Sequence, residues 1–193
     1  MSEQTVNMHQ DLIDACRKFD RTAQVKIYEL YYKAMYNTSY RILNHSAEAE
    51  DAMQEAFLEA FRKLESYRGD ASFGAWLRRI VINKSLDILK KKKEFTFPEM
   101  DAFEREDEVQ EQKEEEDLLK AQVTAVRKAL EQLPSNYRII LSLYLVEGYD
   151  HQEIAEILDL TYSNVRVRYL RAKNKLLEEV RRHRKEYMES LNN

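Results

Sequence analysis

The sequence has few of the residues that punctuate sheets or build reactive sites. Its 193 residues include 3 glycines, 2 prolines and 1 cysteine. Because sheets need frequent turns, this scarcity predicts an all-α protein. The single cysteine, Cys16, cannot form an internal disulfide, which favours a reducing, cytoplasmic compartment. A glycine-rich P-loop that cradles phosphates is excluded.

Long apolar runs are also missing. No stretch is long enough to span a bilayer and no signal peptide opens the chain, so we expect no membrane insertion. The four histidines lie far apart without partner cysteines, which argues against zinc. No nucleophile elbow or catalytic dyad stands in a suitable context. We therefore expect no metal site, no cofactor and no enzymatic activity.

Charge is distributed unevenly along the chain, although the net charge is only −4. Residues 94–120 hold twelve acids and three bases. Residues 62–93 hold ten bases and three acids, and residues 161–185 hold nine bases and two acids. Local charge governs nucleic-acid binding more than the average does. We predict two cationic helical domains, residues 1–93 and 118–193, joined by a flexible acidic linker over residues 94–117.

The stretch 133–176 contains three short helical patterns separated by turn signals. The expected N-caps are Ser135 for the first helix, Asp150 with Glu153 as a capping box for the second, and Thr161 for the third. Gly148 should end the first of these helices. Two short helices joined by a brief turn, the second of them cationic, are typical of a helix-turn-helix.

The last of these helices presents two different faces. Apolar spacing predicts an inner face of Val165, Tyr169, Ala172 and Leu176. The side chains left toward solvent are Arg166, Val167, Leu170, Arg171 and Lys173. Such a face suits a DNA major groove, where guanidinium groups bind phosphates or guanine and small apolar groups meet thymine methyls. The alternative is an ordinary cationic surface helix.

The N-terminal half predicts three amphipathic helices. The first should bury Met8, Leu12, Ile13, Cys16 and Phe19, and the second, which ends near Asn44, should bury Ile27, Leu30, Ala34, Met35 and Ile42. The tyrosines of the second helix are expected at the rim of the core. Ser46 should cap the third helix. Its outer stripe, at i, i+3, i+4 and i+7, is either a solvated face or a protein-docking surface, and consists of Asp51, Gln54, Glu55 and Leu58.

A turn over residues 67–73 precedes the next helix, which Ser72 can cap. Aromatic rings are interleaved here with positive charge, as in proteins that hold single-stranded nucleic acid. Tyr67 and Phe73 flank the turn and are the better candidates for base stacking. Trp76 is better interpreted as a core residue, with base stacking as the alternative.

Three groups of residues resemble motifs of the bacterial extracytoplasmic-function (ECF) sigma factors, the smallest members of the sigma-70 family. The resemblance covers residues 23–93 and 118–180. The motifs are residues 49–57, residues 67–83, and Glu153-Ile154-Ala155 with Val165-Arg166-Val167-Arg168. It implies a sigma-2-like domain, and a sigma-4-like domain with a C-terminal helix-turn-helix. Family members often have Gly where Asp159 stands in the turn.

The resemblance also implies roles for individual residues. The stripe Asp51, Gln54, Glu55 and Leu58 would dock on the clamp helices of the polymerase β′ subunit. The minus-10 promoter element would meet Tyr67, Arg68, Gly69, Asp70, Phe73, Trp76, Asn83, Lys84 and Asp87. The minus-35 element would meet Arg166, Val167, Arg168, Leu170, Arg171 and Lys173. The linker would run toward the RNA exit path of the polymerase.

The partners implied by the resemblance are core RNA polymerase (its β′ clamp helices and β flap), promoter DNA and an anti-sigma factor. Two other interpretations remain open from the residues alone. One is a free-standing helix-turn-helix regulator, which leaves the Asp51–Leu58 stripe unused. The other is an all-helical adaptor whose basic helices meet acidic partners.

Overall fold

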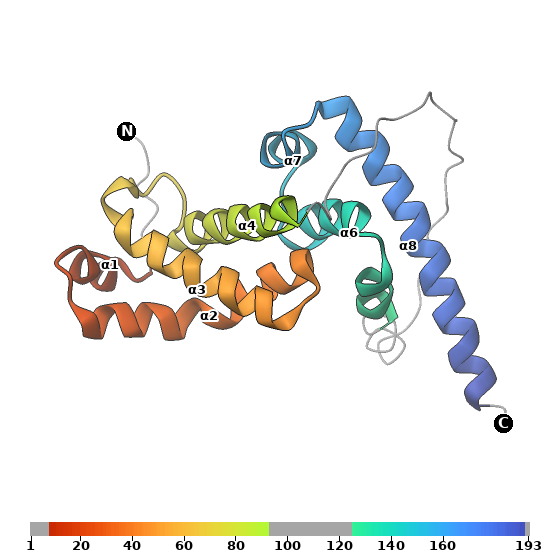
Figure 1. The fold of residues 1–193 in the computed structure, drawn as a ribbon, viewed down its shortest axis with the longest axis horizontal. Coiled ribbons are helices and arrows are strands. Elements are labelled where there is room, and N and C mark those ends of the chain that lie inside the picture. The colour runs from red at the N-terminus through yellow and green to blue at the C-terminus, as the bar shows by residue number, and fades with distance from the viewer. Residues whose placement is uncertain (1–7, 93–124, 192–193) are drawn as a thin grey trace. The chain divides into compact units, whose positions relative to one another are not determined.

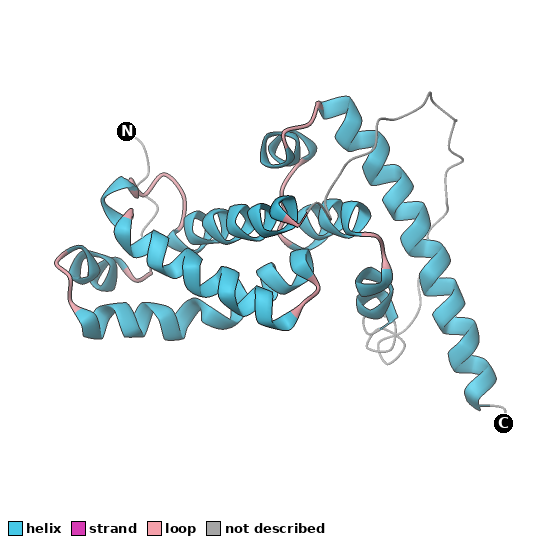
Figure 2. Ribbon diagram, in the orientation of Figure 1, coloured by secondary structure: helices cyan, strands magenta, loops and turns pink. Residues whose placement is uncertain are grey.

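The computed structural model describes residues 8–92 and 125–191, with side chains as far as His183 in the last helix. The chain divides into two compact units, Met1–Glu94 and Phe95–Asn193, and each is treated separately below. Both described ranges contain helices and loops but no strand (Figure 2). The prediction of an all-α fold is confirmed. The expected acidic linker, residues 94–117, lies outside the described residues.

The N-terminal unit is a small helical bundle. Its helices are α1 (Gln10–Arg17), α2 (Arg21–Leu43), α3 (Ser46–Arg62) and α4 (Phe73–Lys91), with a 3₁₀ turn, η1, at Leu64–Ser66. Each of the three long helices packs on the other two, and α3 runs antiparallel to both α2 and α4 (Figure 1). Helix α1 packs against α2 at one end of the bundle.

Small side chains allow α3 to pack closely in this bundle. Ala49, Ala52, Ala56 and Ala60 recur on its inner face and are at most 1% exposed. Between α2 and α4, the buried hydroxyls of Ser39 and Ser85 are 2.8 Å apart. The tyrosine rings of α2 are half-buried at the edge of the apolar cluster, which confirms their predicted place.

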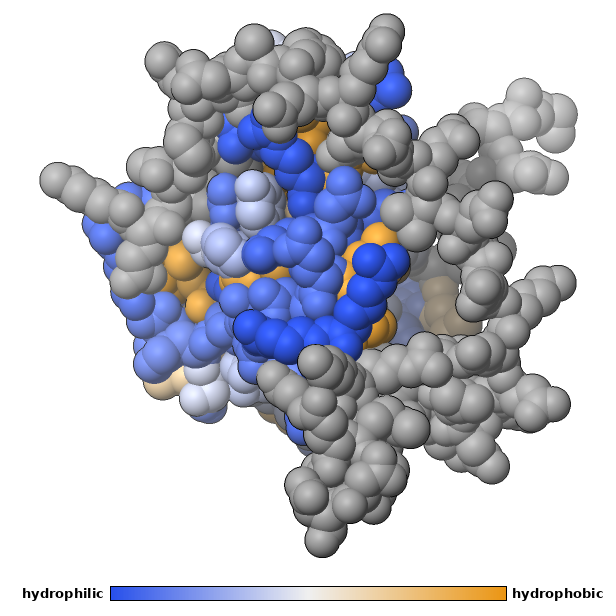
Figure 3. Space-filling model, turned by 90° about the vertical axis from the view of Figure 1, so that its right-hand side faces the viewer, coloured by the Kyte–Doolittle hydropathy of each residue, from blue (hydrophilic) through white to orange (hydrophobic). Residues whose placement is uncertain are grey.

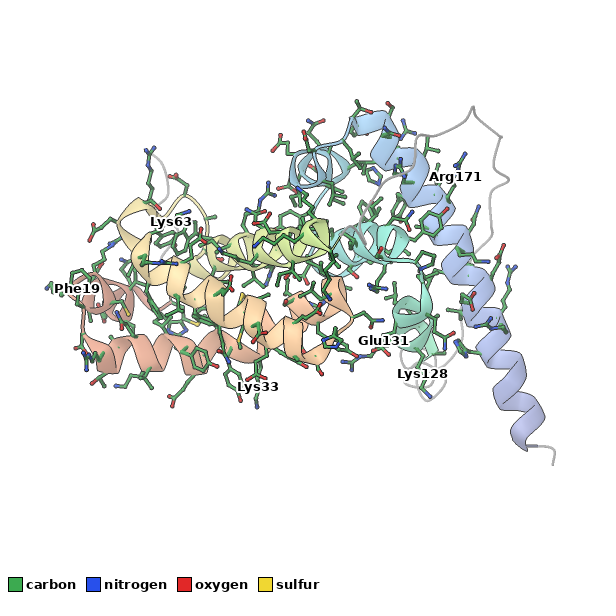
Figure 4. All side chains as sticks on the ribbon, in the orientation of Figure 1. Phe19, Lys33, Lys63, Lys128, Glu131 and Arg171 are labelled. Carbon is green, nitrogen blue, oxygen red and sulfur yellow. The ribbon has the colours of Figure 1, made fainter. Side chains whose placement is uncertain are left out.

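Several expectations for the N-terminal unit are wrong. Met8 and Phe19 lie outside α1 and are 88% and 82% exposed. Phe19 adopts a left-handed backbone conformation (φ 61°) in the turn before α2, and its side chain points outward (Figure 4). Leu30 is also half exposed, because the inner face of α2 is narrower than its apolar pattern. Ala34, expected on that inner face, is exposed as well. His45, not Ser46, caps α3.

The C-terminal unit begins with a helix over residues 125–132, followed by α6 (Ser135–Leu141). Helix α6 continues into a π-helical turn, η2 (Ser142–Val146). Helix α7 (His151–Leu158) and the 30-residue α8 (Tyr162–Leu191) complete the unit. The last two form the predicted helix-turn-helix, joined by residues 159–161.

The N-cap residues and the turn residue of the helix-turn-helix adopt the predicted roles. The Asp150 carboxylate accepts hydrogen bonds from the backbone N–H groups of Gln152 and Glu153, both at 2.8 Å, and the Glu153 side chain bonds back to Asp150 N. Asp159 takes the left-handed conformation (φ 56°) that glycine often supplies. Thr161 Oγ1 accepts from Asn164 N at 3.3 Å.

The expected N-cap of α6 is wrong. Ser135 is the first residue inside the helix, Pro134 occupies the cap position, and no side chain caps this end. The predicted helix ending near Gly148 is correct, because that glycine has φ 78° just after the π-helical turn. The π-helical turn itself had no visible signal in the sequence.

The core of the C-terminal unit fixes the rotation of α8. Ala172 is fully buried and Leu176 is 7% exposed, and both pack with Ala129, Leu133 and Leu141. Val165 is fully buried as well. The predicted inner face of α8 is therefore confirmed, with Tyr169 half-buried at its edge.

The capping box gives a test of the fold. Replacing Asp150 by Ala removes acceptors for two N–H groups at the start of α7 and should lower the free energy of unfolding by about 1 kcal/mol. Glu156→Ala, on the exposed middle of the same helix, is the matched control. Urea denaturation followed by circular dichroism measures both. Equal values for the two variants would show that the box does not stabilise α7.

Candidate functional site

The outer stripe of α3 is a continuous exposed surface. Asp51, Gln54, Glu55 and Leu58 are all exposed, and Leu58 keeps 63% of its area in contact with solvent. The buried alanines on the opposite side of α3 hold the stripe outward. An exposed leucine among acids has the composition of a protein-docking surface rather than of a core.

An apolar groove adjoins this stripe, and sequence analysis did not anticipate it. Residues from α2 and α3 line the groove: Arg21, Gln24, Val25, Tyr28, Gln54, Phe57, Leu58 and Phe61. Val25 is 56% exposed, so the leucine has an apolar neighbour across the groove. In the sequence, Val25, an apolar residue on an otherwise polar side of α2, was the one feature that indicated this groove.

The turn after α3 does not expose the rings expected to stack on bases. Tyr67 is 4% exposed and Phe73 is 2% exposed, and their ring centroids are 5.6 Å apart at an edge-to-face angle. The Tyr67 hydroxyl donates to Ala71 O at 2.7 Å across the turn. The prediction that these two rings are accessible is wrong, because they form the apolar base of the turn. Arg68 and Asp70 are exposed, with Gly69 between them at φ 84°.

Trp76 is the half-buried ring of this cluster. Its centroid lies 5.2 Å from that of Tyr67 and 5.6 Å from that of Phe73. It also borders an open hollow between α3 and α4, which we call the α3–α4 hollow. The lining residues are Glu59, Lys63, Ser66, Trp76, Ile80, Asn83, Lys84 and Asp87. Four of the residues predicted to meet the minus-10 element, Trp76, Asn83, Lys84 and Asp87, are thus brought together.

An ion-pair network forms one wall of the hollow. The Glu59 carboxylate lies 2.6 Å from Lys63 Nζ and 2.7 Å from Lys84 Nζ, each through a different oxygen. Hydrogen bonds from the two lysines lower the pKa of Glu59 to about 2, and the bond that Lys84 donates to Glu59 raises the pKa of Lys84. Glu59 and Lys84 are therefore both ionised at neutral pH. Glu59 and Lys63 were not among the predicted site residues.

Helix α8 exposes three of the six residues predicted for DNA reading. Arg166 and Lys173 are exposed, and Leu170 is 40% exposed. Val167 and Arg171 are half-buried, and Arg171 extends from α8 in Figure 4. The face of the molecule drawn in Figure 3 is mostly hydrophilic among its described residues, with small hydrophobic patches.

Arg168 does not belong to the exposed face. It is 5% exposed, and burial lowers its pKa. It lies three residues after Val165 and four before Ala172, so it shares their inner face. Its predicted place at the DNA surface is wrong, and this helical spacing could have revealed it.

His151, the first residue of α7, joins the two helices of the helix-turn-helix through ring contacts. It stacks on Tyr144 with a centroid distance of 4.8 Å and meets Tyr169 edge-on at 5.0 Å. Burial lowers the pKa of His151, and the nearby Arg166 lowers it further. The ring is therefore neutral at pH 7 and acts in packing.

Within the described residues, no group of three or more histidine, cysteine, aspartate or glutamate side chains could hold a metal ion. None of the described helices combines the length and the apolar character needed to cross a membrane.

Comparison with known proteins agrees with this arrangement of helices. Residues 27–95 match the family described as Sigma-70 region 2, and residues 124–176 match Sigma-70, region 4. The ECF RNA polymerase sigma-E factor of Escherichia coli (strain K12) is 30% identical over 181 residues, which cover 90% of this chain and 93% of that protein. The chain is an ECF-type member of the sigma-70 family.

Other relatives and solved structures extend the comparison. The RNA polymerase sigma-H factor of Pseudomonas aeruginosa is 28% identical over 177 residues, which cover 88% of this sigma factor and 92% of the relative. The fold resembles that of CnrH in complex with the cytosolic domain of CnrY (TM-score 0.53, 21% identity, 88% and 95% covered). It also resembles RpoE in complex with the anti-sigma factor NepR from Bartonella quintana (TM-score 0.54, 22% identity, 81% and 95% covered).

The chain is therefore a sigma factor that directs transcription initiation. A free-standing helix-turn-helix regulator is not favoured, since it would not need the region 2 match over residues 27–95.

The burial of Arg168 separates stability from DNA reading in this sigma factor. Arg168→Ala removes a buried side chain and should lower the free energy of unfolding by about 1–3 kcal/mol. Arg166→Ala, at an exposed position two residues away, should change it by less than about 0.5 kcal/mol. Urea denaturation of the two variants provides the comparison. If Arg166→Ala proves the more destabilising, the assigned rotation of α8 is wrong.

Proposed function

We propose that the sigma factor joins core RNA polymerase through its N-terminal unit and brings two DNA-contacting surfaces to a promoter. Residues 1–93 act as the polymerase-binding and minus-10 domain, and residues 118–193 as the minus-35 domain. One observation carries the proposal. In a chain of this family, the outer stripe of α3, the α3–α4 hollow and the outer face of α8 all lie at the surface.

Polymerase binding is assigned to the stripe of Asp51, Gln54, Glu55 and Leu58. The resemblance assigns it the β′ clamp helices as its partner. Apolar contact by Leu58 and the adjoining groove would supply affinity, and the acids would orient the partner by charge. The C-terminal unit would contact the β flap.

Reading of the minus-35 element is assigned to the exposed face of α8. Arg166, Leu170 and Lys173 point away from the core, with Val167 and Arg171 beside them. Arginine and lysine bind phosphates or guanine edges, and Leu170 offers apolar contact to a thymine methyl. Arg168 would support this face from within, since it is buried.

Recognition of the minus-10 element is assigned to the α3–α4 hollow and to the turn over residues 67–73. Trp76 offers a half-buried ring, and Asn83, Lys84 and Asp87 offer polar groups beside it. Arg68, Gly69 and Asp70 form the exposed part of the turn. Tyr67 and Phe73 would hold the shape of the turn rather than stack on a base, because their rings are buried.

Opening the duplex needs more than this small protein can supply. Extruding a base costs a few kcal/mol, and contacts to phosphates are weakened by salt. The polymerase must contribute the rest, so we expect weak promoter binding by the free protein and tight binding by the holoenzyme. The protein itself would carry out no chemistry and would act in the cytoplasm, where the polymerase is found.

An anti-sigma factor is a further proposed partner. RpoE was solved in complex with the anti-sigma factor NepR, and CnrH was solved in complex with the cytosolic domain of CnrY. The apolar groove between α2 and α3 is the exposed surface that a competitor of polymerase would need to cover. Binding there would keep the sigma factor from the polymerase.

Two sets of substitutions test the division of labour. Arg166→Ala with Arg171→Ala should reduce promoter-specific initiation about tenfold or more while leaving co-purification with core polymerase intact, because each lost base or phosphate contact costs about 1–3 kcal/mol. Asp51→Ala with Leu58→Ala should abolish co-purification. Initiation is measured by transcription on fragmented host DNA with mapped start sites.

Each variant pair serves as the control for the other. All four side chains lie at least partly on the surface, so folding should be retained, which thermal unfolding verifies. Loss of the same activity in both pairs would contradict the proposed division between polymerase binding and DNA reading.

A further inference from the structure

The ion-pair network of the α3–α4 hollow has a geometry that a nucleic-acid phosphate would also satisfy. Glu59 places one carboxylate oxygen on Lys63 and the other on Lys84, at 2.6 and 2.7 Å. Lys63 lies one turn further along α3, whereas Lys84 reaches across from α4. A single anionic group is thus held between two ammonium groups by charge-assisted hydrogen bonds.

The surroundings of this network favour a nucleotide as its ligand. The same hollow is lined by the Trp76 ring and the Asn83 amide, which can contact a base while the lysines bind its phosphate. The other anions that act on Lys84 are Glu55 and Asp87, and neither bridges the two lysines. Among the described acids that line the hollow, Glu59 is the one that pairs with both lysines.

Part of the network lies at the surface, where exchange with a phosphate is feasible. The Lys63 side chain is 62% exposed, and Figure 4 shows it near the end of α3. Ion pairs that involve an exposed side chain, as the pair of Glu59 with Lys63 does, are weakened by solvent. A backbone phosphate, which releases counterions when it is neutralised, is therefore a stronger competitor for the lysines than its charge alone suggests.

We infer that Glu59 is an intramolecular substitute for a DNA phosphate, which neutralises Lys63 and Lys84 until single-stranded DNA displaces it. The inference rests on the proposed function of the hollow. In the free protein the carboxylate lowers affinity for arbitrary nucleic acid. In the open promoter complex the two lysines bind the backbone next to the base that Trp76 and Asn83 contact.

Replacing Glu59 by Gln tests this inference directly. The full-length variant should bind a mixed-sequence, fluorescently labelled single-stranded DNA about threefold to tenfold more tightly than the wild type. The dependence of log affinity on log salt should steepen by about 0.7, the increment for one more neutralised phosphate on a single strand. Fluorescence anisotropy over a series of KCl concentrations measures both quantities.

The matched control is Glu48→Gln. Glu48 also pairs with a lysine of α4, Lys92, and its side chain is 21% exposed against 20% for Glu59, but it does not line the hollow. The same loss of charge there should leave the salt dependence unchanged. The gain from Glu59→Gln should also vanish in a background of Lys63→Gln with Lys84→Gln.

Three results would overturn the inference: a DNA affinity of Glu59→Gln equal to that of the wild type, an equal gain in affinity from Glu48→Gln, or a gain from Glu59→Gln that persists when both lysines are replaced. If Glu59→Gln fails to fold by thermal unfolding, Lys63→Gln alone decides, because it should weaken DNA binding and reduce the salt dependence. Co-purification of the wild type with core polymerase tests the proposed function independently. If the wild type co-purifies with core polymerase but Glu59→Gln leaves DNA affinity unchanged, the inference is wrong and the proposed function is unaffected.

Discussion

Burial of one narrow face on each helix is the constraint on which the functional surfaces of this protein depend. In α3 the alanines at 52, 56 and 60 are buried in the bundle, so the stripe on the opposite side of the helix faces outward. In α8 the burial of Val165, Ala172 and Leu176 likewise turns the face proposed to contact DNA outward. Burying an apolar side chain contributes about 1.5–3 kcal/mol, whereas an exposed ion pair contributes about 1 kcal/mol or less. The core therefore sets helix rotation, and the surface charges follow it.

Charge segregation then gives the two units their partners. A chain with a net charge of −4 would seem unsuited to DNA, but the acids are concentrated in residues 94–120 and the bases in the two helical segments. Within the N-terminal unit, acids occur on the outer stripe of α3, while the α3–α4 hollow places two lysines beside Glu59 and Asp87. Protein docking and nucleic-acid binding can thus use different faces of the same three-helix bundle without competing for the same side chains.

Much of this arrangement could be predicted from the sequence, since helical periodicity and capping are local. The capping box at Asp150, the left-handed Asp159 and the inner face of α8 are examples. The accessibility expected of Tyr67 and Phe73 is wrong because a turn can fold its aromatic rings under itself, and only contacts between distant residues, such as that between the Phe73 and Tyr31 rings, reveal this. The Glu59 bridge was missed for the same reason, as Lys84 is far away in sequence. Arg168 was different: its spacing from Val165 already placed it inside.

We propose that this ECF-type sigma factor makes core polymerase select promoters through two separate DNA elements. Transcription by core polymerase with and without the purified protein on fragmented host DNA, with every start site mapped, tests this. We expect a set of discrete new start sites that share one sequence block near position minus 10 and another near minus 35. New start sites without shared blocks, or the same sites with and without the protein, would show that the protein does not select promoters in this way.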